Sequence, residues 1–354
     1  MSEAARQARV DAVALEDFVA RAFGALGVPQ DDARTVAGLM VEADLLGQET
    51  HGVFRLRQYV ARLRDGGCNP RPAITVVTER AGTALIDGDD GLGHLAMTAA
   101  SELAIAKART AGIGWVGIRR SNHAGPAALY VRPQAAAGMI GLAAAVGSAN
   151  HVPPFGGTDL LLGTNPIAVA APTLGEPFLL DMATTVAAMG KIKTLAQRGE
   201  PMPEGWMVGR DGRPLTDPAR RDEGFMLPIG GAKGFGLSVA IGLLAGTLNQ
   251  AAFGSDVIEF TRESGRTSNT GQFVAAIDIA AFGPLAAFEA TLDRTFDEMR
   301  ASAPLPGHDA VRLPGDGKTA AMEGRRRDGL ALHPALRADL DAIAADLGVD
   351  PLQS

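Results

Sequence analysis

The chain has 354 residues, of which 46% are hydrophobic and 21% charged, and its formal net charge is −7. This composition excludes a disordered chain, and the acidic balance argues against nucleic acid as the main partner, because phosphate binding needs a basic surface. The single cysteine, Cys68, excludes an internal disulfide and a cysteine metal cluster.

The same bulk features favour a cytoplasmic protein. One cysteine fits a reduced compartment. The first residues do not have the apolar core of a signal peptide, and no uninterrupted apolar run reaches the length of a membrane span. We therefore expect a cytoplasmic protein with no membrane segment.

The first seventy residues are predicted to be helical, because their apolar side chains recur at helical spacing. One helix covers residues 15–23, and a second begins at Pro29 with two acidic residues in its first turn. A third helix covers about 53–63 and ends at Gly66-Gly67.

Between the second and third of these helices lies Glu49-Thr50-His51-Gly52-Val53-Phe54-Arg55. If the segment is helical, His51 and Arg55 lie one turn apart and share a face. Arg55 could then bind a carboxylate through two hydrogen bonds while His51 gives a proton to the adjacent oxygen, as reduction of an α-keto acid requires. A helix cap or a surface histidine is the alternative interpretation of this pair.

From Pro70 onward, strands and helices alternate without the regular βαβ order of a doubly wound sheet. Short apolar runs predict strands at 74–77, 83–86, 115–118, 140–146, 167–171, 178–180 and 271–279. Helices are predicted at 95–111, 233–248, 285–299 and 334–347, and a long loop at 198–232.

Two glycine motifs are rejected as phosphate sites. Residues 112–117 match the dinucleotide fingerprint, but a helix precedes them and a strand follows, which inverts the order that the fingerprint needs. Gly190-Lys191 lacks both the following Ser or Thr and the upstream glycine of a phosphate loop.

A third glycine motif, residues 230–238, leads directly into an apolar helix and includes Lys233. It could bind an anion at the helix N-terminus, or its glycines could simply permit close packing. Asp181 also has two interpretations. It could orient a histidine, or it could cap the next helix, which the local sequence favours.

Metal and serine-hydrolase chemistry have little support. His51, His94, His123 and His151 could converge, but they have no metal-binding spacing, and there is no G-x-S-x-G motif. We expect no metal.

The remaining motifs, taken together, resemble the malate/L-lactate dehydrogenase family that lacks a Rossmann fold and includes sulfolactate, ureidoglycolate and diketogulonate oxidoreductases and Δ1-piperideine-2-carboxylate reductases. The matching stretches appear in the family's order and span most of the chain. They are residues 43–44, 50–56, 88–93, 121–125, 154–157, 163–166, 181–184, 203–206, 230–237 and 313–316.

The resemblance implies an α+β fold with a central, largely antiparallel sheet. Residues 1–72 and 305–354 would form a helical substrate and dimerisation part. Residues 73–190 and 250–304 would form the sheet domain that binds the nicotinamide cofactor, and 191–249 a loop and small helical part. Members of this family are usually homodimers with the active site near the interface.

The resemblance also implies the roles of individual residues. His51 would be the proton donor, Asp181 its relay partner and Arg55 the carboxylate ligand, with Thr50 beside them; some members use the second histidine, His123, as the acid–base group. The implied cofactor contacts are Ser121, Asn122, His123, Ala124, Gly125, Thr164, Met182, Ala183, Lys233, Gly234, Pro314, Gly315 and Asp316. Thr50, Ala124 and Asp316 depart from the residues that the family usually has there.

The implied function is NAD(P)-dependent hydride transfer between the cofactor and a small 2-hydroxy or 2-keto acid such as malate or lactate, with either NAD or NADP. Reduction of a cyclic 2-imino acid is one alternative. The others are a metal-dependent hydrolase or lyase built on the scattered histidines, and a binding protein that has lost the chemistry.

Overall fold

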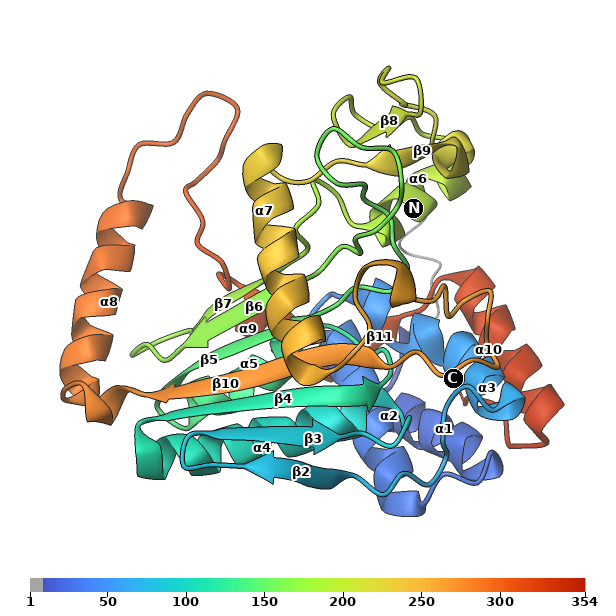
Figure 1. Ribbon diagram of the computed structural model, residues 1–354, viewed down its shortest axis with the longest axis horizontal. Coiled ribbons are helices and arrows are strands. Elements are labelled where there is room, and N and C mark those ends of the chain that lie inside the picture. The colour runs from blue at the N-terminus through green and yellow to red at the C-terminus, as the bar shows by residue number, and fades with distance from the viewer. Residues whose placement is uncertain (1–8, 354) are drawn as a thin grey trace.

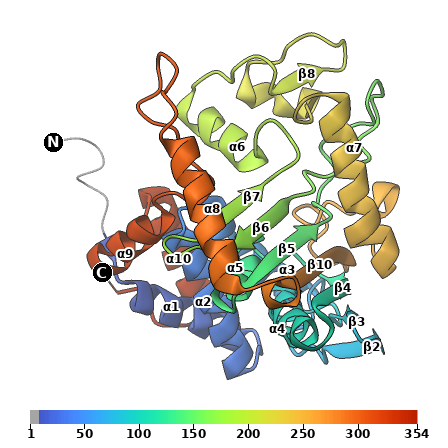
Figure 2. The same ribbon diagram turned by 90° about the vertical axis from the view of Figure 1, so that its left-hand side faces the viewer.

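A computed structural model describes residues 9–353, including all side chains in that range except those of Thr194 and Gln197. The first eight residues of the expected helical part, and its last residue, lie outside the described range. Figure 1 shows a central twisted sheet with helices on both faces, and Figure 2 shows helices from both ends of the chain side by side.

Seven strands form the central sheet, in the order β2-β3-β4-β10-β5-β6-β7. Their bounds are β2 Thr75–Glu79, β3 Thr83–Asp87, β4 Ile113–Ser121, β5 Met139–Ala145, β6 Ile167–Ala171, β7 Phe178–Met182 and β10 Thr270–Asp278. Only β3 and β4 pair in parallel among these neighbours, and the other pairs are antiparallel. The expected mixed fold with a largely antiparallel, non-Rossmann sheet is confirmed.

Strand β10 shows how the sheet is covered on both faces. Val274 and Ala276 join the core beneath α4 (Gly93–Ala111) and α5 (Ala128–Ala136), whereas the alternating Phe273 and Ala275 pack toward α7 (Ala232–Ile241) and the turns after it. Because successive side chains of a strand point to opposite faces, a strand buried on both faces is apolar over most of its length.

The glycines of the rejected fingerprint permit close packing. Gly112 ends α4 in the left-handed conformation, with φ of 78°. A Cβ at Gly114 would lie 2.1 Å from the Ala104 carbonyl oxygen of α4, and one at Gly117 would lie 2.0 Å from Asn249 Oδ1 on the other face. These glycines therefore let helical segments approach β4 closely.

Both chain ends contribute to one group of helices. They are α1 (Ala12–Ala25), α2 (Gln30–Leu45), α3 (Leu56–Asp65), α9 (Lys318–Asp328) and α10 (Pro334–Leu347). Strand β1 (Arg9–Val10) pairs with β11 (Leu330–Ala331), and Figure 2 shows α1 beside α9 and α10. This pairing supports the expected grouping of both ends into one part, which we retain as a proposal.

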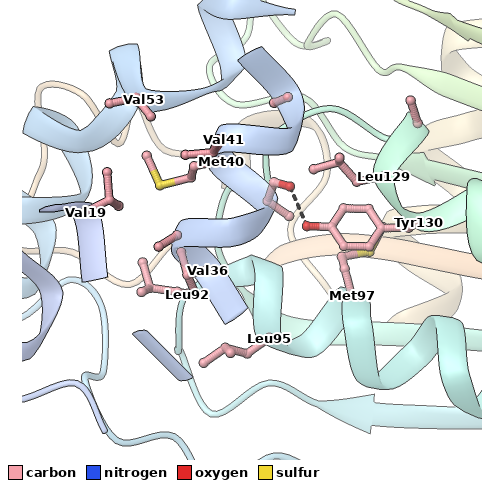
Figure 3. Packing of buried hydrophobic residues seen from close by; sticks show 14 of the residues in the cluster. Val19, Val36, Met40, Val41, Val53, Leu92, Leu95, Met97, Leu129 and Tyr130 are labelled. Atoms are coloured by element: carbon pink, nitrogen blue, oxygen red, sulfur yellow. Dashed lines mark hydrogen bonds between the residues drawn. The ribbon is translucent and has the colours of Figure 1, made fainter. Parts of the chain in front are cut away.

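The helical part packs on α4 and α5 through a continuous apolar core. Figure 3 shows a portion of it, with Val36 and Met40 from α2, Leu95 and Met97 from α4, and Leu129 and Tyr130 from α5. The Tyr130 hydroxyl, marked by the dashed line, donates a hydrogen bond to the Ala124 carbonyl oxygen at 2.6 Å. This bond ties α5 to the 121–125 segment.

The region expected to be one long loop has more structure than its sequence indicated. Helix α6 (Met189–Arg198) is followed by the paired strands β8 (Met207–Gly209) and β9 (Gly224–Met226), with a 3-10 turn, η4 (Pro218–Glu223), between them. A small apolar cluster that includes Ile192, Met202 and Met226 supports these elements. Within residues 198–232, which follow α6, the expectation of one long loop was wrong, because the strands there are too short to show a period.

Helix α7 continues through a π-helical segment, η5 (Gly242–Gly246), into the 3-10 turn η6 (Thr247–Asn249). Residues 232–249 are the one stretch in the described chain that is long and apolar enough to cross a membrane by length and composition. Here this stretch packs against the sheet, with Ile241 and Ala245 buried beside Phe273. The other elements are the 3-10 turns η7 (Gly254–Asp256) and η8 (Ile279–Ala281) and the helix α8 (Leu285–Arg300).

Candidate active site

The segment that carries His51 and Arg55 is two short 3-10 turns, η2 (Glu49–His51) and η3 (Val53–Arg55), joined at Gly52. The expectation of a shared helical face was therefore wrong. Buried Asp44 holds the junction, because its Oδ2 accepts the Val53 N–H at 3.0 Å. A Cβ at Gly52 would lie 2.1 Å from Asp44 Oδ1, so the junction requires glycine. Burial raises the pKa of Asp44 to about 7.

His51 and Arg55 nevertheless line the same cleft, which has a volume of about 670 Å³. Arg55 is fixed from behind by two hydrogen bonds, from Nε to the Thr50 carbonyl oxygen at 2.8 Å and from Nη1 to Gln58 Oε1 at 2.9 Å. Its Nη2 has no hydrogen-bond partner within residues 9–353. The guanidinium is thus oriented before any ligand binds.

The two histidine motifs meet in this cleft. The rings of His51 and His123 stack with centroids 5.7 Å apart and planes inclined by 17°. Burial, followed by the nearby Arg55 charge, lowers the pKa of His51 to about 4. The same effects, with those of His51 and His94, hold the pKa of His123 well below its usual range. Both rings are therefore neutral near pH 7.

Asp181 lines the cleft at the end of β7, but its contacts differ from those expected. Its Oδ2 accepts hydrogen bonds from Gln48 Nε2 and from the Ala128 N–H, both at 2.9 Å. Asp181 therefore caps α5, which precedes it in the chain, and not the next helix. In the described part of the chain, no hydrogen bond joins it to His51. Burial raises the pKa of Asp181, and these two bonds oppose the shift.

Ten of the residues proposed from sequence lie in the cleft wall. They are Thr50, His51, Arg55, His123, Ala124, Gly125, Thr164, Asp181, Met182 and Ala183. They come from the helical part, from the segment after β4, and from the neighbourhood of β6 and β7. The structure thus brings together stretches that the sequence separates by more than a hundred residues.

Ser121 and Asn122 do not line the cleft, because both are buried behind it. Asn122 Oδ1 accepts from Arg62 Nη2 at 2.7 Å and from Ser268 Oγ at 3.0 Å, and its Nδ2 donates to the Asp90 carbonyl oxygen. In this structure Asn122 anchors the segment that presents His123.

Two other predicted stretches also lie outside the cleft wall. A Cβ at Gly234 would lie 1.9 Å from the Ile229 carbonyl oxygen, so the glycine permits close packing at the start of α7, where Lys233 is exposed. Pro314 and Gly315 lie against β7, with the Leu179 N–H donating to the Pro314 carbonyl oxygen at 3.1 Å. Asp316 forms an ion pair with Arg300 at 2.8 Å. A cofactor role for these five residues remains a prediction.

Sequence reasoning missed three amide side chains that fit a nicotinamide cofactor. Gln48, Asn150 and Gln272 line the cleft, and each has a buried amide oxygen without a partner in the described chain. Their amide nitrogens donate to Asp181 Oδ2, the Gly254 carbonyl oxygen and the Asn122 carbonyl oxygen, which fixes the oxygens as acceptors. A carboxamide and ribose hydroxyls supply the N–H and O–H donors that such acceptors need. Gln272, a polar residue within the apolar strand β10, was the available signal.

Charged side chains at the cleft wall were missed as well. Lys193, Arg221 and Arg262 lie there with Asp222 and Glu259. Partial burial, followed by the charges of Arg55 and Arg221, lowers the pKa of Lys193. Among residues 9–353, no group of three or more His, Cys, Asp or Glu side chains is arranged to hold a metal ion.

Comparison with known proteins finds relatives that match nearly the whole chain. A family model described as malate/L-lactate dehydrogenase matches residues 10–341. The chain is 40% identical to a malate dehydrogenase of Pyrococcus horikoshii, with 97% of each chain covered. It is 35% identical to the NAD(+) ureidoglycolate dehydrogenase of Escherichia coli O157:H7, over 84% of this chain and 86% of that one.

A solved structure shows that the likeness extends to the fold. The sulfolactate dehydrogenase of Methanocaldococcus jannaschii superposes with a TM-score of 0.90 at 36% identity, covering 97% of this chain and 98% of that one.

Proposed function

This chain belongs to the malate/L-lactate dehydrogenase family, and we propose that its cleft binds NAD or NADP beside a small 2-hydroxy or 2-keto acid. The chain is a nicotinamide-dependent oxidoreductase of small hydroxy acids. The observation that supports our assignment of the site is the meeting of His51, His123 and the prepositioned Arg55 in one cleft.

Arg55 binds the carboxylate of the substrate in this proposal, because its free Nη2 belongs to a guanidinium already oriented by Thr50 and Gln58. His51, one short turn away, lies beside the C2 oxygen and exchanges a proton with it. Gln48, Asn150 and Gln272 hold the cofactor through their amide oxygens. The cofactor, when bound, accepts or supplies hydride at the substrate C2.

Asp181 acts on His51 indirectly in this proposal. Its carboxylate holds the Gln48 side chain, and the backbone carbonyl oxygen of Gln48 accepts the backbone N–H of His51 at 2.8 Å. Asp181 thereby orients the turn that carries the histidine.

Two further properties belong to the proposal. We infer a homodimer, which is supported by exposed leucines along α7 and the turns after it, Leu237, Leu243 and Leu248. We infer a cytoplasmic location, supported by the single buried cysteine and the acidic charge of −7.

The proposed function is tested by a screen of small 2-hydroxy, 2-keto and cyclic 2-imino acids, in which cofactor absorbance is followed with NAD(H) and NADP(H) in turn. We expect turnover of a hydroxy or keto acid. Turnover of cyclic imino acids alone would show that the substrate is a cyclic imino acid and not a hydroxy or keto acid. Cofactor binding without turnover of any acid would contradict the proposed catalysis.

A further inference from the structure

Tyr59, a buried residue of α3, forms the closest polar contact of the second histidine. Its hydroxyl oxygen lies 2.6 Å from His123 Nδ1. The backbone N–H of Gly125 points to the same nitrogen at 3.3 Å. His123 Nδ1 is therefore held between a phenol and a peptide N–H.

These two partners determine which ring nitrogen carries the hydrogen. A peptide N–H can only donate, so a hydrogen on Nδ1 would oppose the Gly125 N–H. Burial raises the pKa of Tyr59, which keeps the phenol protonated and able to donate to Nδ1 as well. His123 Nδ1 is thus an acceptor, and its hydrogen lies on Nε2, the ring nitrogen left for the cleft.

The partner of His51 imposes no such restriction. His51 Nδ1 lies 3.0 Å from Thr50 Oγ1, and a threonine hydroxyl can either donate or accept. His51 can therefore gain or lose a proton at Nε2 while it keeps its hydrogen bond. The two stacked rings differ in this respect although both line the cleft.

We propose that Tyr59 is a positioning residue that holds His123 as the Nε2–H tautomer. His123 is then a fixed hydrogen-bond donor to the substrate C2 oxygen, and His51 exchanges the proton. This inference rests on the proposed function and assigns separate roles to its two histidines. In oxidation, the C2–H bond breaks and its electron pair leaves as hydride to the cofactor, while the hydroxyl proton moves to Nε2 of His51. Nε2 of His123 already carries a hydrogen and cannot accept that proton.

The other groups that face this pair favour a neutral His123. His94 meets the Tyr59 ring edge-on at 5.4 Å, and neither of its ring nitrogens has a partner in the described chain. The nearby charged and titratable side chains are Arg55 and His51 on the His123 side and Arg55 and Cys68 on the Tyr59 side. A positive charge on His123 would be repelled by Arg55.

Nitrogen-15 NMR of the histidine-labelled protein, without substrate, tests the tautomer directly. The His123 signals are assigned by their loss in His123→Gln. We expect an Nε2–H ring in the native protein. In Tyr59→Phe only the Gly125 N–H still faces Nδ1, so the share of the Nδ1–H tautomer should rise, with the His51 signals unchanged. Phenylalanine keeps the ring that packs near Phe23, and circular dichroism verifies folding of the variant. An Nδ1–H ring in the native protein overturns the proposal.

A crossed set of variants tests the two roles in turnover. Glutamine places an amide N–H near the position of Nε2, so it can donate a hydrogen bond, but it cannot transfer a proton. His123→Gln should therefore retain more activity than His123→Ala, by about tenfold or more. His51→Gln should be no better than His51→Ala, each losing about a hundred- to ten-thousandfold in kcat.

The reverse pattern, with glutamine tolerated at position 51 and not at 123, overturns the proposal. Absence of turnover in the native protein contradicts the proposed function instead, and the NMR result then still decides the tautomer.

Discussion

At the scale of single residues, the cleft depends on side chains that are fixed before a ligand arrives. Arg55 is held by Thr50 and Gln58, and the turn around it is held by Asp44. Such preorganisation lowers the entropy lost on binding, and it fixes the orientation of the guanidinium toward a bound carboxylate. Changes at Arg55, Thr50 or Gln58 should therefore affect kinetics more than folding.

His51→Ala should lower kcat by about a hundred- to ten-thousandfold, the usual contribution of a positioned acid or base. Steady-state kinetics in both directions measure the effect, and thermal unfolding verifies the fold. His308→Ala, at an exposed histidine outside the cleft wall, is the matched control and should leave kcat unchanged. Turnover of His51→Ala near the native value would remove this residue from the chemistry.

The pH dependence should follow the protonation state of His51. Its pKa is lowered to about 4, so the neutral form that accepts a proton predominates above that value. For oxidation, kcat/KM should be independent of this group from about pH 5 upward and should fall as pH drops through about 4. For reduction, the protonated form is needed, so kcat/KM should rise as pH is lowered toward 4. If kcat/KM for oxidation instead fell with a midpoint near pH 6.5, the pKa of His51 would not be lowered in the free enzyme.

Arg55→Lys should raise KM for the acid by about ten- to a hundredfold with a smaller effect on kcat, because an ammonium cannot reproduce the planar fork. Steady-state rates over a range of substrate concentrations, at saturating cofactor, measure KM and kcat. Arg57→Lys is a suitable control, since Arg57 forms an exposed ion pair with Asp339 away from the cleft. If both variants keep the native KM, Arg55 does not bind the carboxylate.

At the scale of elements, close contacts at glycines hold the sheet and its covering helices together. Asn249 of η6 donates to the Ala245 and Gln272 carbonyl oxygens, both at 2.8 Å, and its Oδ1 occupies the space where a Cβ of Gly117 would be. This contact fastens the end of the α7 segment to β4 and β10. It is one reason why the residues 112–117 contain so many glycines.

Gly117→Ala should therefore destabilise the fold by about 1–3 kcal/mol, the range found for overpacked sites. Chemical denaturation measures the change. Gly24→Ala in α1 is the control, because a Cβ there has no neighbour within 4 Å, and it should be neutral or stabilising by about 0.4–1 kcal/mol. Equal stability of Gly117→Ala and the native protein would contradict the packing role of Gly117.

The sequence predicts the elements better than it predicts their contacts. Apolar periodicity predicted the amphipathic helices and the buried strands, because burial of one side of an element places apolar residues at regular spacing. Other features depend on tertiary contacts, which produce no periodic pattern in the sequence. They are the pairing of β8 with β9, the two 3-10 turns around Gly52 and the partners of Asp181. For the site, polar motifs marked His51, Arg55 and His123. Gln48, Asn150 and Lys193 stand in no motif and could be found only by their position in the cleft wall, whereas Gln272 stands out as a polar residue within an apolar strand.

At the scale of the whole molecule, an exposed apolar face runs along α7 and the turns after it. Leu243 and Leu248 are 54% and 57% exposed. Exposed apolar side chains that gather on one side of a helix are typical of protein interfaces. The face lies on the side of the sheet opposite α4 and α5 (Figure 1).

If a second copy of the chain covers this face, Leu243→Asp should shift a native dimer toward the monomer. Light scattering coupled to gel filtration measures the mass over a range of concentrations. Val13→Asp, at an exposed residue of α1, introduces the same charge elsewhere and should leave the mass unchanged. A monomeric native protein would contradict the homodimer, and a dimer unaffected by Leu243→Asp would place the interface on another face.

The pairing of β1 with β11 has a consequence for how the protein is made. The Arg9 guanidinium donates a hydrogen bond at 2.9 Å to the Gly329 carbonyl oxygen, 320 residues further along the chain. The N-terminal helices beside His51 are synthesised well before α9 and α10, which pack on them. We therefore expect the sheet, whose strand β10 ends at Asp278, to form before the helices around the cleft are fully packed.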